Sequence, residues 1–236
     1  QSRGFAKLHG PFYNSPLANV HIGREIWYTS GGSSTISTNY WEGGFLATEE
    51  CDAVDEVTVT LSEHVRTIYN YMFSKLKLKS ITIPASVTYI GSGAFMDCDD
   101  LNTIVFEDGD TPLRVTSQYV VSTVTFWGPF YDSPLTSITL GREMEYYKGD
   151  GSVPDEENDG LFASEENVES LSVTLTDKVK TLSPYMFAGT SLKEITIPAS
   201  VTSIGMDAFN GCKNLAQVEL PESLQKLSYL TFANCE

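Results

Sequence analysis

Few side chains in this sequence of 236 residues could carry catalysis. Its three histidines are His9, His21 and His64. A serine or cysteine nucleophile would need one of them as its base and a further group to orient that base, and the sequence around them suggests no such arrangement. The adjacent pairs Glu49–Glu50 and Glu165–Glu166 cannot face each other across one glycosidic bond. We therefore predict that the chain is not an enzyme and has no catalytic residues.

Candidate metal ligands are also sparse. An acidic stretch contains Asp150, Asp155, Glu156, Glu157 and Asp159, and carboxylate oxygens of this kind can bind Ca²⁺. Their spacing does not follow an EF-hand loop. We interpret 150–159 as a solvated acidic loop, with calcium as the alternative, and we expect no other cofactor.

The cysteines point to structure rather than to chemistry. Cys98, Cys212 and Cys235 each follow a phenylalanine by three residues, and Cys51 stands apart. A constant phase indicates one structural position, and small buried thiols suit it. None of the cysteines is clustered at the spacing of a zinc site. A disulfide between Cys212 and Cys235 remains an alternative.

Composition narrows the class of partner. The formal net charge is −16 and the isoelectric point is near 4.5, whereas nucleic acids and anionic membranes are recognised by faces rich in Lys and Arg. No apolar run reaches the roughly 18 residues that a membrane span needs. The first ten residues lack the apolar segment of a signal peptide, and the sequence ends inside a repeat. We expect a fragment of a longer exported protein.

A sequence repeat of about 23 residues runs through the chain and sets the positions of these residues. The segment LKSITIPASVTYIGSGAFMDCDDL at 78–101 returns at 192–215 as LKEITIPASVTSIGMDAFNGCKNL. A unit of about 23 residues that recurs in this way indicates a stacked repeat architecture. The copies begin at Leu17, Val54, Leu78, Leu101, Leu135, Val168, Leu192 and Leu215.

A longer period contains the short one. GPFYNSPL at 10–17 returns as GPFYDSPL at 128–135, an offset of 128 − 10 = 118, and Pro84 returns as Pro198, an offset of 198 − 84 = 114. We interpret residues 1–236 as a single solenoid made by tandem duplication of a block of about 115 residues. The first block covers about 10–127 and the second about 128–236.

One unit shows how the fold would form. In SITIP at 80–84 the isoleucines alternate with hydroxyl residues, which predicts a strand with one buried face, and the proline ends its ladder. Val87 and Ile90 turn inward again, and Gly91 permits a tight corner. The following segment is too short for a helix but can form one packed turn around Phe95. Stacked units then share a continuous core, and their strands pair in parallel.

The pattern L-x-x-I-x-I-P-x-S-V-T-x-I-G-x-x-A-F-x-x-C, nearly intact at 78–98 and 192–212, resembles the BspA-type leucine-rich repeat family of bacterial surface proteins. The resemblance implies a leucine-rich repeat solenoid, mainly β with short turns, whose parallel sheet lies on a concave face. It also implies a secreted or cell-surface bacterial protein, with adhesion to a host or bacterial surface protein or glycan as the function. It provides no catalytic residues to transfer.

Two surfaces could contact such a partner. Period-2 alternation predicts a concave face of small hydroxyls with a few acids, including the outward pairs Glu56–Thr58 and Ser170–Ser172. Two insertions, at 27–44 and 145–160, have aromatic residues at their bases, and loops carry function more often than scaffold strands do. The candidate partner-binding residues are Trp27, Tyr28, Tyr40, Trp41, Tyr146 and Tyr147.

These features favour a binding or adhesion module that works through the insertions and, second, through the concave face. The alternative role of these aromatic residues is to fix the insertions to the flank of the solenoid. A structural spacer that displays another domain and has no ligand of its own is the alternative function. The sequence does not fix the oligomeric state.

Overall fold

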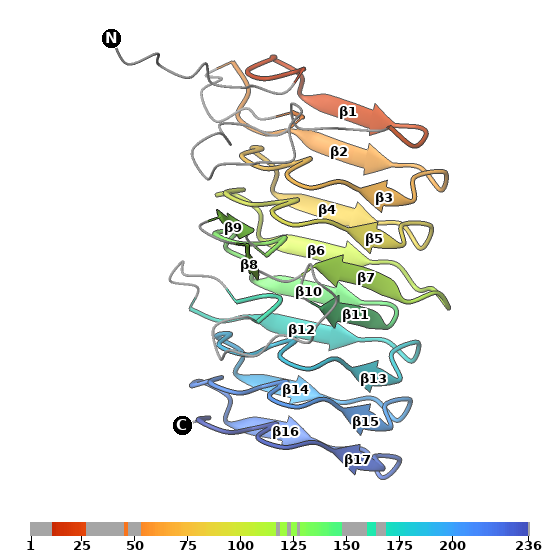
Figure 1. Cartoon of the computed structure of the whole chain (residues 1–236), viewed down its shortest axis with the longest axis vertical. Helices are drawn as coiled ribbons and strands as arrows, with labels where there is room; N and C mark the ends of the chain where they lie inside the picture. The colour runs from red at the N-terminus through yellow and green to blue at the C-terminus, as the bar shows by residue number, and fades with distance from the viewer. Residues whose placement is uncertain are drawn as a thin grey trace.

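The computed structural model describes residues 11–26, 45–46, 53–116, 119–121, 124–126, 128–147, 160–163 and 169–235. Every regular element in these residues is a β-strand. The strands stack along the long axis of the molecule as a solenoid of two parallel sheets (Figure 1). The solenoid and its parallel strands confirm the fold predicted from the sequence.

The first sheet contains the longer strand of each repeat. All its paired neighbours are parallel: β1 pairs with β2, β14 pairs with β16, and β4, β6, β10 and β12 form one unbroken ladder. Its strands are β1 (Asn19–Ile22), β2 (Thr58–Leu61), β4 (Ser80–Ile83), β6 (Thr103–Phe106), β10 (Ser137–Leu140), β12 (Ser172–Leu175), β14 (Glu194–Thr196) and β16 (Gln217–Glu219).

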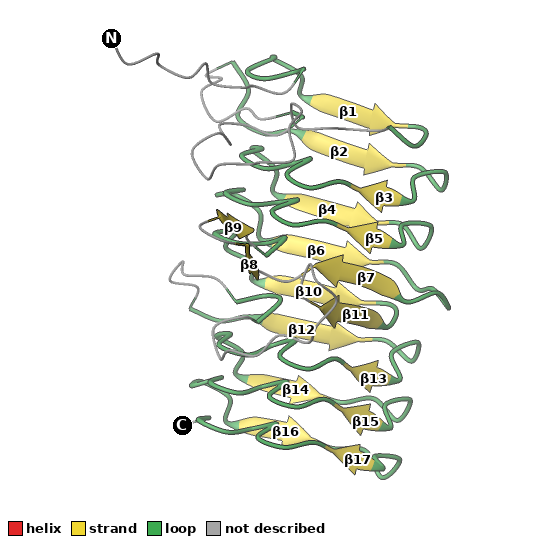
Figure 2. Cartoon of the chain, in the orientation of Figure 1, coloured by secondary structure: helices red, strands yellow, loops and turns green. Residues whose placement is uncertain are grey.

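The second sheet contains the shorter return strands, which run opposite to those of the first sheet (Figure 2). The sequence did not reveal it, because most of its strands are only two residues long. Its strands are β3 (Thr67–Ile68), β5 (Tyr89–Ile90), β7 (Leu113–Thr116), β11 (Met144–Tyr147), β13 (Thr181–Leu182), β15 (Ser203–Ile204) and β17 (Lys226–Leu227). A separate antiparallel hairpin of β8 (Tyr119–Val121) and β9 (Val124–Phe126) also escaped prediction.

Alternation builds the first sheet as predicted. In β4, Ile81 and Ile83 are buried whereas Ser80 and Thr82 are exposed. The buried side chains of both sheets form one hydrophobic cluster.

A column of phenylalanines runs through this cluster, with one ring from each of seven consecutive repeats. Phe95, which is fully buried, stacks on Phe73 with the ring centroids 5.4 Å apart. The stacking continues through Phe130, Phe162, Phe187, Phe209 and Phe232. The prediction that Phe95 occupies a packed turn in the core is confirmed.

Gly91 is needed for space rather than for an unusual backbone angle. A Cβ atom at this position would lie 2.8 Å from the backbone nitrogen of Asn70, one repeat earlier. The left-handed conformation occurs instead in the phenylalanine turn, at Gly93 and Asp97.

Two of the predicted repeat starts are wrong by three residues. The sequence interpretation began repeats at Val54 and Val168, which placed Val57 and Leu171 in the first inward strand position. The structure places Leu171 opposite Leu192, at the start of the repeat, and Val173 in the inward position beside Ile138. These repeats read V-x-V at 57–59 and L-x-V at 171–173 rather than L-x-x-I, so each is one residue shorter. V-x-x-V at 54–57 and V-x-x-L at 168–171 imitate the regular spacing.

The outward pairs change accordingly. Thr58 and Thr60 lie beside Asn19 and His21, and Thr174 rather than Ser170 accompanies Ser172. Although the repeat start moves by three residues, the inward strand position moves by only two, from Leu171 to Val173. The predicted faces were nevertheless correct, because a shift of two residues along a strand leaves each side chain on the same face.

The thiols of Cys98, Cys212 and Cys235 are free, so no disulfide links Cys212 to Cys235. Each thiol donates to a carbonyl oxygen in the preceding repeat: Cys98 Sγ to Phe73 at 3.0 Å and Cys212 Sγ to Phe187 at 3.0 Å. Burial raises the pKa of the Cys98 thiol to about 12. Cys98 and Cys212 are therefore buried structural thiols, and Cys51 lies outside the described residues.

Arg142 is the largest fully buried side chain, and it joins two repeats that are not adjacent. It follows β10, yet its guanidinium donates to carbonyl oxygens in the turn after β4. Its Nη1 lies 2.8 Å from Ala85 O and 2.7 Å from Val87 O, and its Nη2 lies 2.9 Å from Pro84 O. Burial lowers the pKa of Arg142 to about 10. The three carbonyls hold its charge inside the solenoid.

Candidate functional site

The structure describes two of the six predicted contact residues. Trp27, Tyr28, Tyr40 and Trp41 lie outside the described residues, as does the acidic stretch 150–159, for which calcium was the alternative interpretation. Tyr146 and Tyr147 end β11, which pairs with β7 through Tyr147, so residues 145–147, assigned to the second insertion from the sequence, belong to the second sheet.

The two tyrosines differ in accessibility. Tyr146 is 5% exposed and belongs to the core, so it is a packing residue rather than a contact residue. Tyr147 points to the opposite side of β11 and is half-buried. Because side chains alternate along a strand, Tyr146 and Tyr147 lie on opposite faces of the sheet. The sequence-based prediction placed both residues in a loop and so grouped them together.

Tyr147 belongs to a cluster on the outer face of the second sheet. The guanidinium carbon of Arg114 lies 4.9 Å from the centre of the Tyr147 ring, and Arg114 Nε lies 3.4 Å from Glu145 Oε2. The side chains of Arg114 and Glu145 are 59% and 58% exposed. A guanidinium over an aromatic face is an attractive cation–π arrangement. This exposed arginine is therefore held in place by two neighbours.

Tyr89 extends the cluster by one repeat. Its hydroxyl lies 3.0 Å from the Thr116 hydroxyl, and Thr116 is buried beside Tyr147 in the β7–β11 ladder. Burial, opposed by the nearby Arg114 charge, raises the pKa of the Tyr147 phenol. We call Tyr89, Arg114, Thr116, Glu145 and Tyr147 the Tyr–Arg patch.

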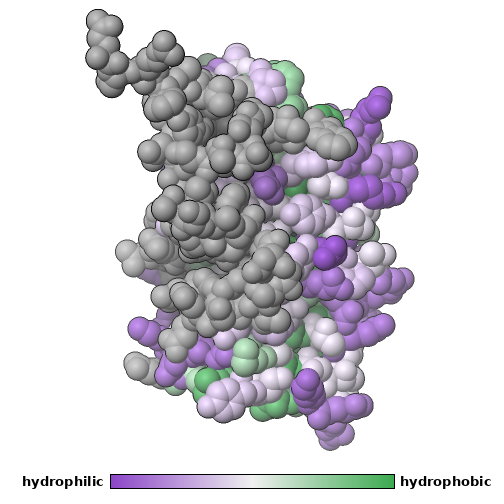
Figure 3. Space-filling model, in the orientation of Figure 1, coloured by the Kyte–Doolittle hydropathy of each residue, from purple (hydrophilic) through white to green (hydrophobic). Residues whose placement is uncertain are grey.

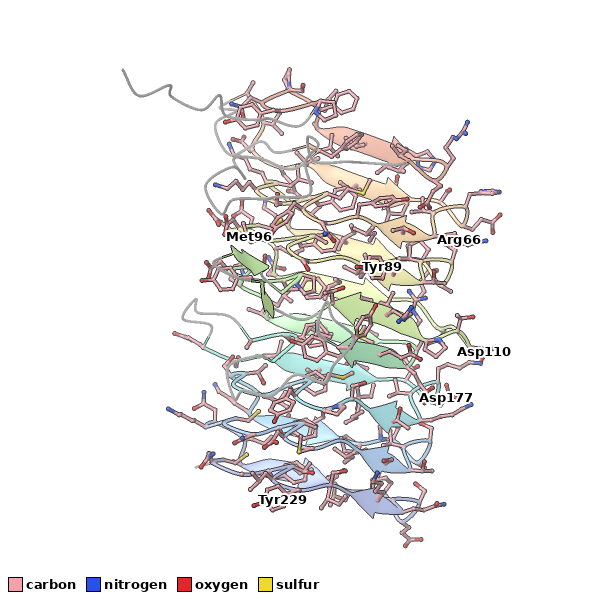
Figure 4. The ribbon with its side chains drawn as sticks, viewed as in Figure 1. Arg66, Tyr89, Met96, Asp110, Asp177 and Tyr229 are labelled. Atoms are coloured by element: carbon pink, nitrogen blue, oxygen red, sulfur yellow. The ribbon has the colours of Figure 1, made fainter. Side chains whose placement is uncertain are left out.

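Figure 4 places Tyr89 of the patch between two borders of the molecule. Tyr89 lies over the middle of the second sheet, whereas Arg66, Asp110 and Asp177 lie at the edge formed by the loops that follow the first-sheet strands. Met96 lies on the opposite side, among the phenylalanine turns. Figure 3 shows hydrophilic side chains gathered along the loop edge. Tyr89 thus lies away from the hydrophilic loop edge.

The exposed face of the first sheet is chemically different. Its outward side chains in β2, β4, β10 and β12 are Ser and Thr. At its start, the His21 ring lies 2.9 Å from the Thr60 hydroxyl. Beside β4, Lys79 Nζ lies 2.8 Å from Glu56 Oε2. Neither contact includes the base, nucleophile and orienting group of a catalytic triad.

A cleft opens on this face where the first sheet divides. The strands β12 and β14 share only the bridge between Leu171 and Leu192, so their ladder stops after one position. The cleft has a volume of about 350 Å³ and is lined by residues of β12, β14 and β16. No sequence motif marks this cleft. It arises because the repeat at Leu171 has one residue fewer between its first two inward positions than the regular L-x-x-I repeat.

Two further findings concern metal sites and membrane spans in the described residues. Across the described ranges, no group of three or more His, Cys, Asp and Glu side chains could hold a metal ion. In the same residues, no helix has the length and apolar character required to cross a bilayer.

Comparison with known proteins identifies the family. The BspA type leucine rich repeat region matches residues 47–146 and 158–236 in six copies. The chain therefore belongs to the BspA-type leucine-rich repeat family, as the repeat motif predicted. None of the curated proteins matches the chain.

Solved structures with the same repeat are distant. A leucine rich cell surface protein from Faecalibacterium prausnitzii is 22% identical, with a TM-score of 0.34, and the match covers 78% of this chain and 56% of that one. The pneumococcal vaccine antigen PcpA is 20% identical, with a TM-score of 0.31 and coverage of 73% and 50%. A leucine-rich repeat protein from Bacteroides ovatus is 18% identical, with a TM-score of 0.31 and coverage of 100% and 89%. The chain thus spans about half the length of the first two.

Proposed function

We propose that this chain is a non-enzymatic binding module of the bacterial cell surface, and that it holds a protein partner through the Tyr–Arg patch. The observation that carries this proposal is the exposed Arg114 held over the ring of Tyr147. Tyrosine and arginine are enriched among the residues that dominate binding energy at protein interfaces. The hydroxyl face of the first sheet lacks both residue types at its described outward positions, so we rank it second.

Preorganisation supports the patch further. An arginine that becomes ordered only on binding loses rotamer entropy, which weakens the complex. Arg114 is already fixed by Glu145 and by Tyr147. A partner carboxylate or carbonyl could therefore use the remaining guanidinium donors at a lower entropic cost.

The position of the patch agrees with the insertions as contact elements. Tyr147 is the last described residue before 148–159, so the patch and the rest of the second insertion are contiguous along the chain. We retain Trp27, Tyr28, Tyr40 and Trp41 of the first insertion as proposed contacts. Family membership supports the extracellular setting and a host or bacterial surface protein as the partner.

A capture experiment tests the proposal. The immobilised chain is incubated with solubilised surface proteins of host epithelial cells, and the captured proteins are compared with those held by the double variant Arg114→Ala/Tyr147→Ala. We expect roughly tenfold weaker capture by this variant, because losing two hot-spot residues removes more than 1 kcal/mol. A glycan array is probed in parallel.

The control is Asp110→Ala/Lys178→Ala, which removes an exposed ion pair at the loop edge and should leave capture unchanged. Equal capture by the wild type and the patch variant would reject the patch. A Trp27→Ala/Trp41→Ala variant that captures normally would reject the first insertion as a contact element.

A further inference from the structure

We propose that the cleft between β12 and β14 binds the side chain of a lysine presented by a partner, in other words a primary alkylammonium group. The cleft lies on the first sheet and the Tyr–Arg patch on the second, so this site is additional to the one proposed above.

The shape of the cleft follows from the missing residue. One residue separates Leu171 from Val173, whereas two separate Leu192 from Ile195. After their shared bridge the two strands therefore fall out of register and part. Val173 is left half-buried, and with Ile195 it gives the cleft an apolar floor. A single-residue mismatch of this kind disrupts a ladder locally.

The walls of the cleft provide hydrogen-bond acceptors. Glu194 and Gln217 are direct neighbours in the β14–β16 ladder, so a carboxylate and an amide lie side by side. The hydroxyls of Ser172 and Thr174 line the facing strand, and Thr196 completes the rim. Among the described residues, no ion pair engages the Glu194 carboxylate. The cleft thus combines one carboxylate, several neutral oxygens and an apolar base.

This combination favours an alkylammonium ligand over other small groups. A phosphate or carboxylate would meet the Glu194 charge in a chain of net charge −16. A sugar ring would find no aromatic side chain to stack on, because none lines the cleft. A lysine side chain has four methylenes for the apolar floor and three donors for acceptors on different strands. Arginine is planar and prefers acceptors in one plane.

The first half of the chain contains a natural comparison for this cleft. The ladder between β2 and β4 also stops after one contact, in which Val57 N lies 2.6 Å from Lys77 O. Ser80 stands 114 positions before Glu194, since 194 − 80 = 114, and Thr103 stands 114 before Gln217, since 217 − 103 = 114. The strand mismatch is thus shared, but the carboxylate and the amide are found only at β14 and β16. We infer that only the cleft between β12 and β14 selects a cation.

The test is a two-dimensional NMR titration of the whole chain with n-butylammonium chloride. We expect saturable chemical-shift changes of the Val173, Ile195 and Gln217 amides. The Kd should be in the millimolar range, which corresponds to a binding free energy of the order of −4 kcal/mol. Glu194→Gln keeps the size and shape of the side chain and removes its charge, and it should weaken binding about fivefold. Butanol, which has the same stem and no charge, should leave these amides unmoved.

Two variants complete the experiment. Ser80→Glu should create new butylammonium shifts at Ile81 and Val59, because it places a carboxylate on β4, where the ladder with β2 has stopped. Arg114→Ala/Tyr147→Ala should bind butylammonium as the wild type does, so the result here is independent of the proposed function. Unchanged affinity in Glu194→Gln, an absence of saturable shifts, or shifts of the same amides by methyl glucoside would each overturn the lysine assignment.

Discussion

The ring of Phe95 stacks on the ring of Phe130, with centroids 5.5 Å apart and planes inclined by 10°. Phe130 stacks in turn on Phe162, also at 5.5 Å. The repeat between Phe95 and Phe130 contains the β8–β9 hairpin, yet the ring spacing is unchanged. Extra residues therefore leave the solenoid sideways, and the phenylalanine column sets the distance between repeats.

Replacing Phe95 with alanine should strongly destabilise the chain. The ring is fully buried and has a stacked neighbour on each side, so its loss leaves a cavity and removes two aromatic contacts. We expect a loss of about 3–5 kcal/mol in the free energy of unfolding, measured by urea titration. Phe12→Ala is the control, because Phe12 is 41% exposed and should cost less than about 1 kcal/mol. A loss below about 1 kcal/mol for Phe95→Ala would contradict the role of the column.

Replacing Arg142 with methionine should also destabilise the fold, by about 3 kcal/mol. Methionine has similar length but leaves the carbonyls of Pro84, Ala85 and Val87 without their buried donor. Urea titration again gives the free energy. Arg24→Met is a matched control, since Arg24 also follows a Gly after a first-sheet strand but is exposed. Equal costs for the two variants would show that the buried guanidinium adds no stability.

Stability should fall in alkaline solution through Cys98. The folded-state pKa of its thiol is about 12, raised from 9.0 mainly by burial. Its contribution is therefore fully present below pH 9 and is lost as the pH rises from 9 towards 12, because the unfolded chain releases the proton first. In this window the free energy of unfolding should decline by about 1.4 kcal/mol per pH unit for this thiol.

The measurement is urea titration at several pH values for the wild type and for Cys98→Ala. Other titrating groups affect both proteins, so the difference between their slopes reports the thiol. Parallel slopes would mean that Cys98 does not titrate with a raised pKa.

Hydrogen exchange should detect the parted strands. The backbone N–H groups of Ser172 and Thr176 donate to carbonyls on the β10 side. Because N–H groups alternate sides along a strand, the N–H of Val173 points towards β14, where the ladder has stopped. Ile104 occupies the matching position within the unbroken ladder. We expect the Val173 amide to exchange at least about tenfold faster than that of Ile104. Similar protection of the two amides would show that β12 and β14 remain bonded in solution.

Arg114 and Tyr147 should be energetically coupled. The cation–π contact between them is exposed, so a double-mutant cycle with alanine should give a coupling energy of about 0.5–1 kcal/mol. Urea unfolding of the four proteins supplies the cycle. Coupling near zero would mean that Tyr147 does not hold the guanidinium, which would also weaken the argument for a preorganised patch.

The sequence predicted the parts of this fold that repeat. Ile81, Ile83 and Phe95 occupy their expected positions because hydrophobic periodicity is the dominant constraint on a stacked strand. The second sheet was missed because two residues such as Tyr89 and Ile90 are too few to display a period. The register at Leu171 was misjudged because a shift that keeps the buried face cannot be recognised from alternation alone.

The candidate sites depend on neighbours that sequence spacing does not reveal. Arg114 and Tyr147 belong to different repeats, and only the β7–β11 ladder brings them together. The separation of Tyr146 from Tyr147 required knowing that β11 continues through both. The cleft beside Glu194 required knowing where a ladder stops. These relationships arise from pairing between repeats rather than from the pattern within one repeat.

The phenylalanine column also has an evolutionary consequence. Each repeat from the second onward adds one ring at a nearly constant spacing, so recombination between copies could insert or delete a whole repeat and leave the remaining contacts intact. The loss of a single residue acts differently, because it opens the ladder, as between β12 and β14. Changes of length by complete repeats would therefore alter the reach of the protein, whereas changes by one residue would create new surface features.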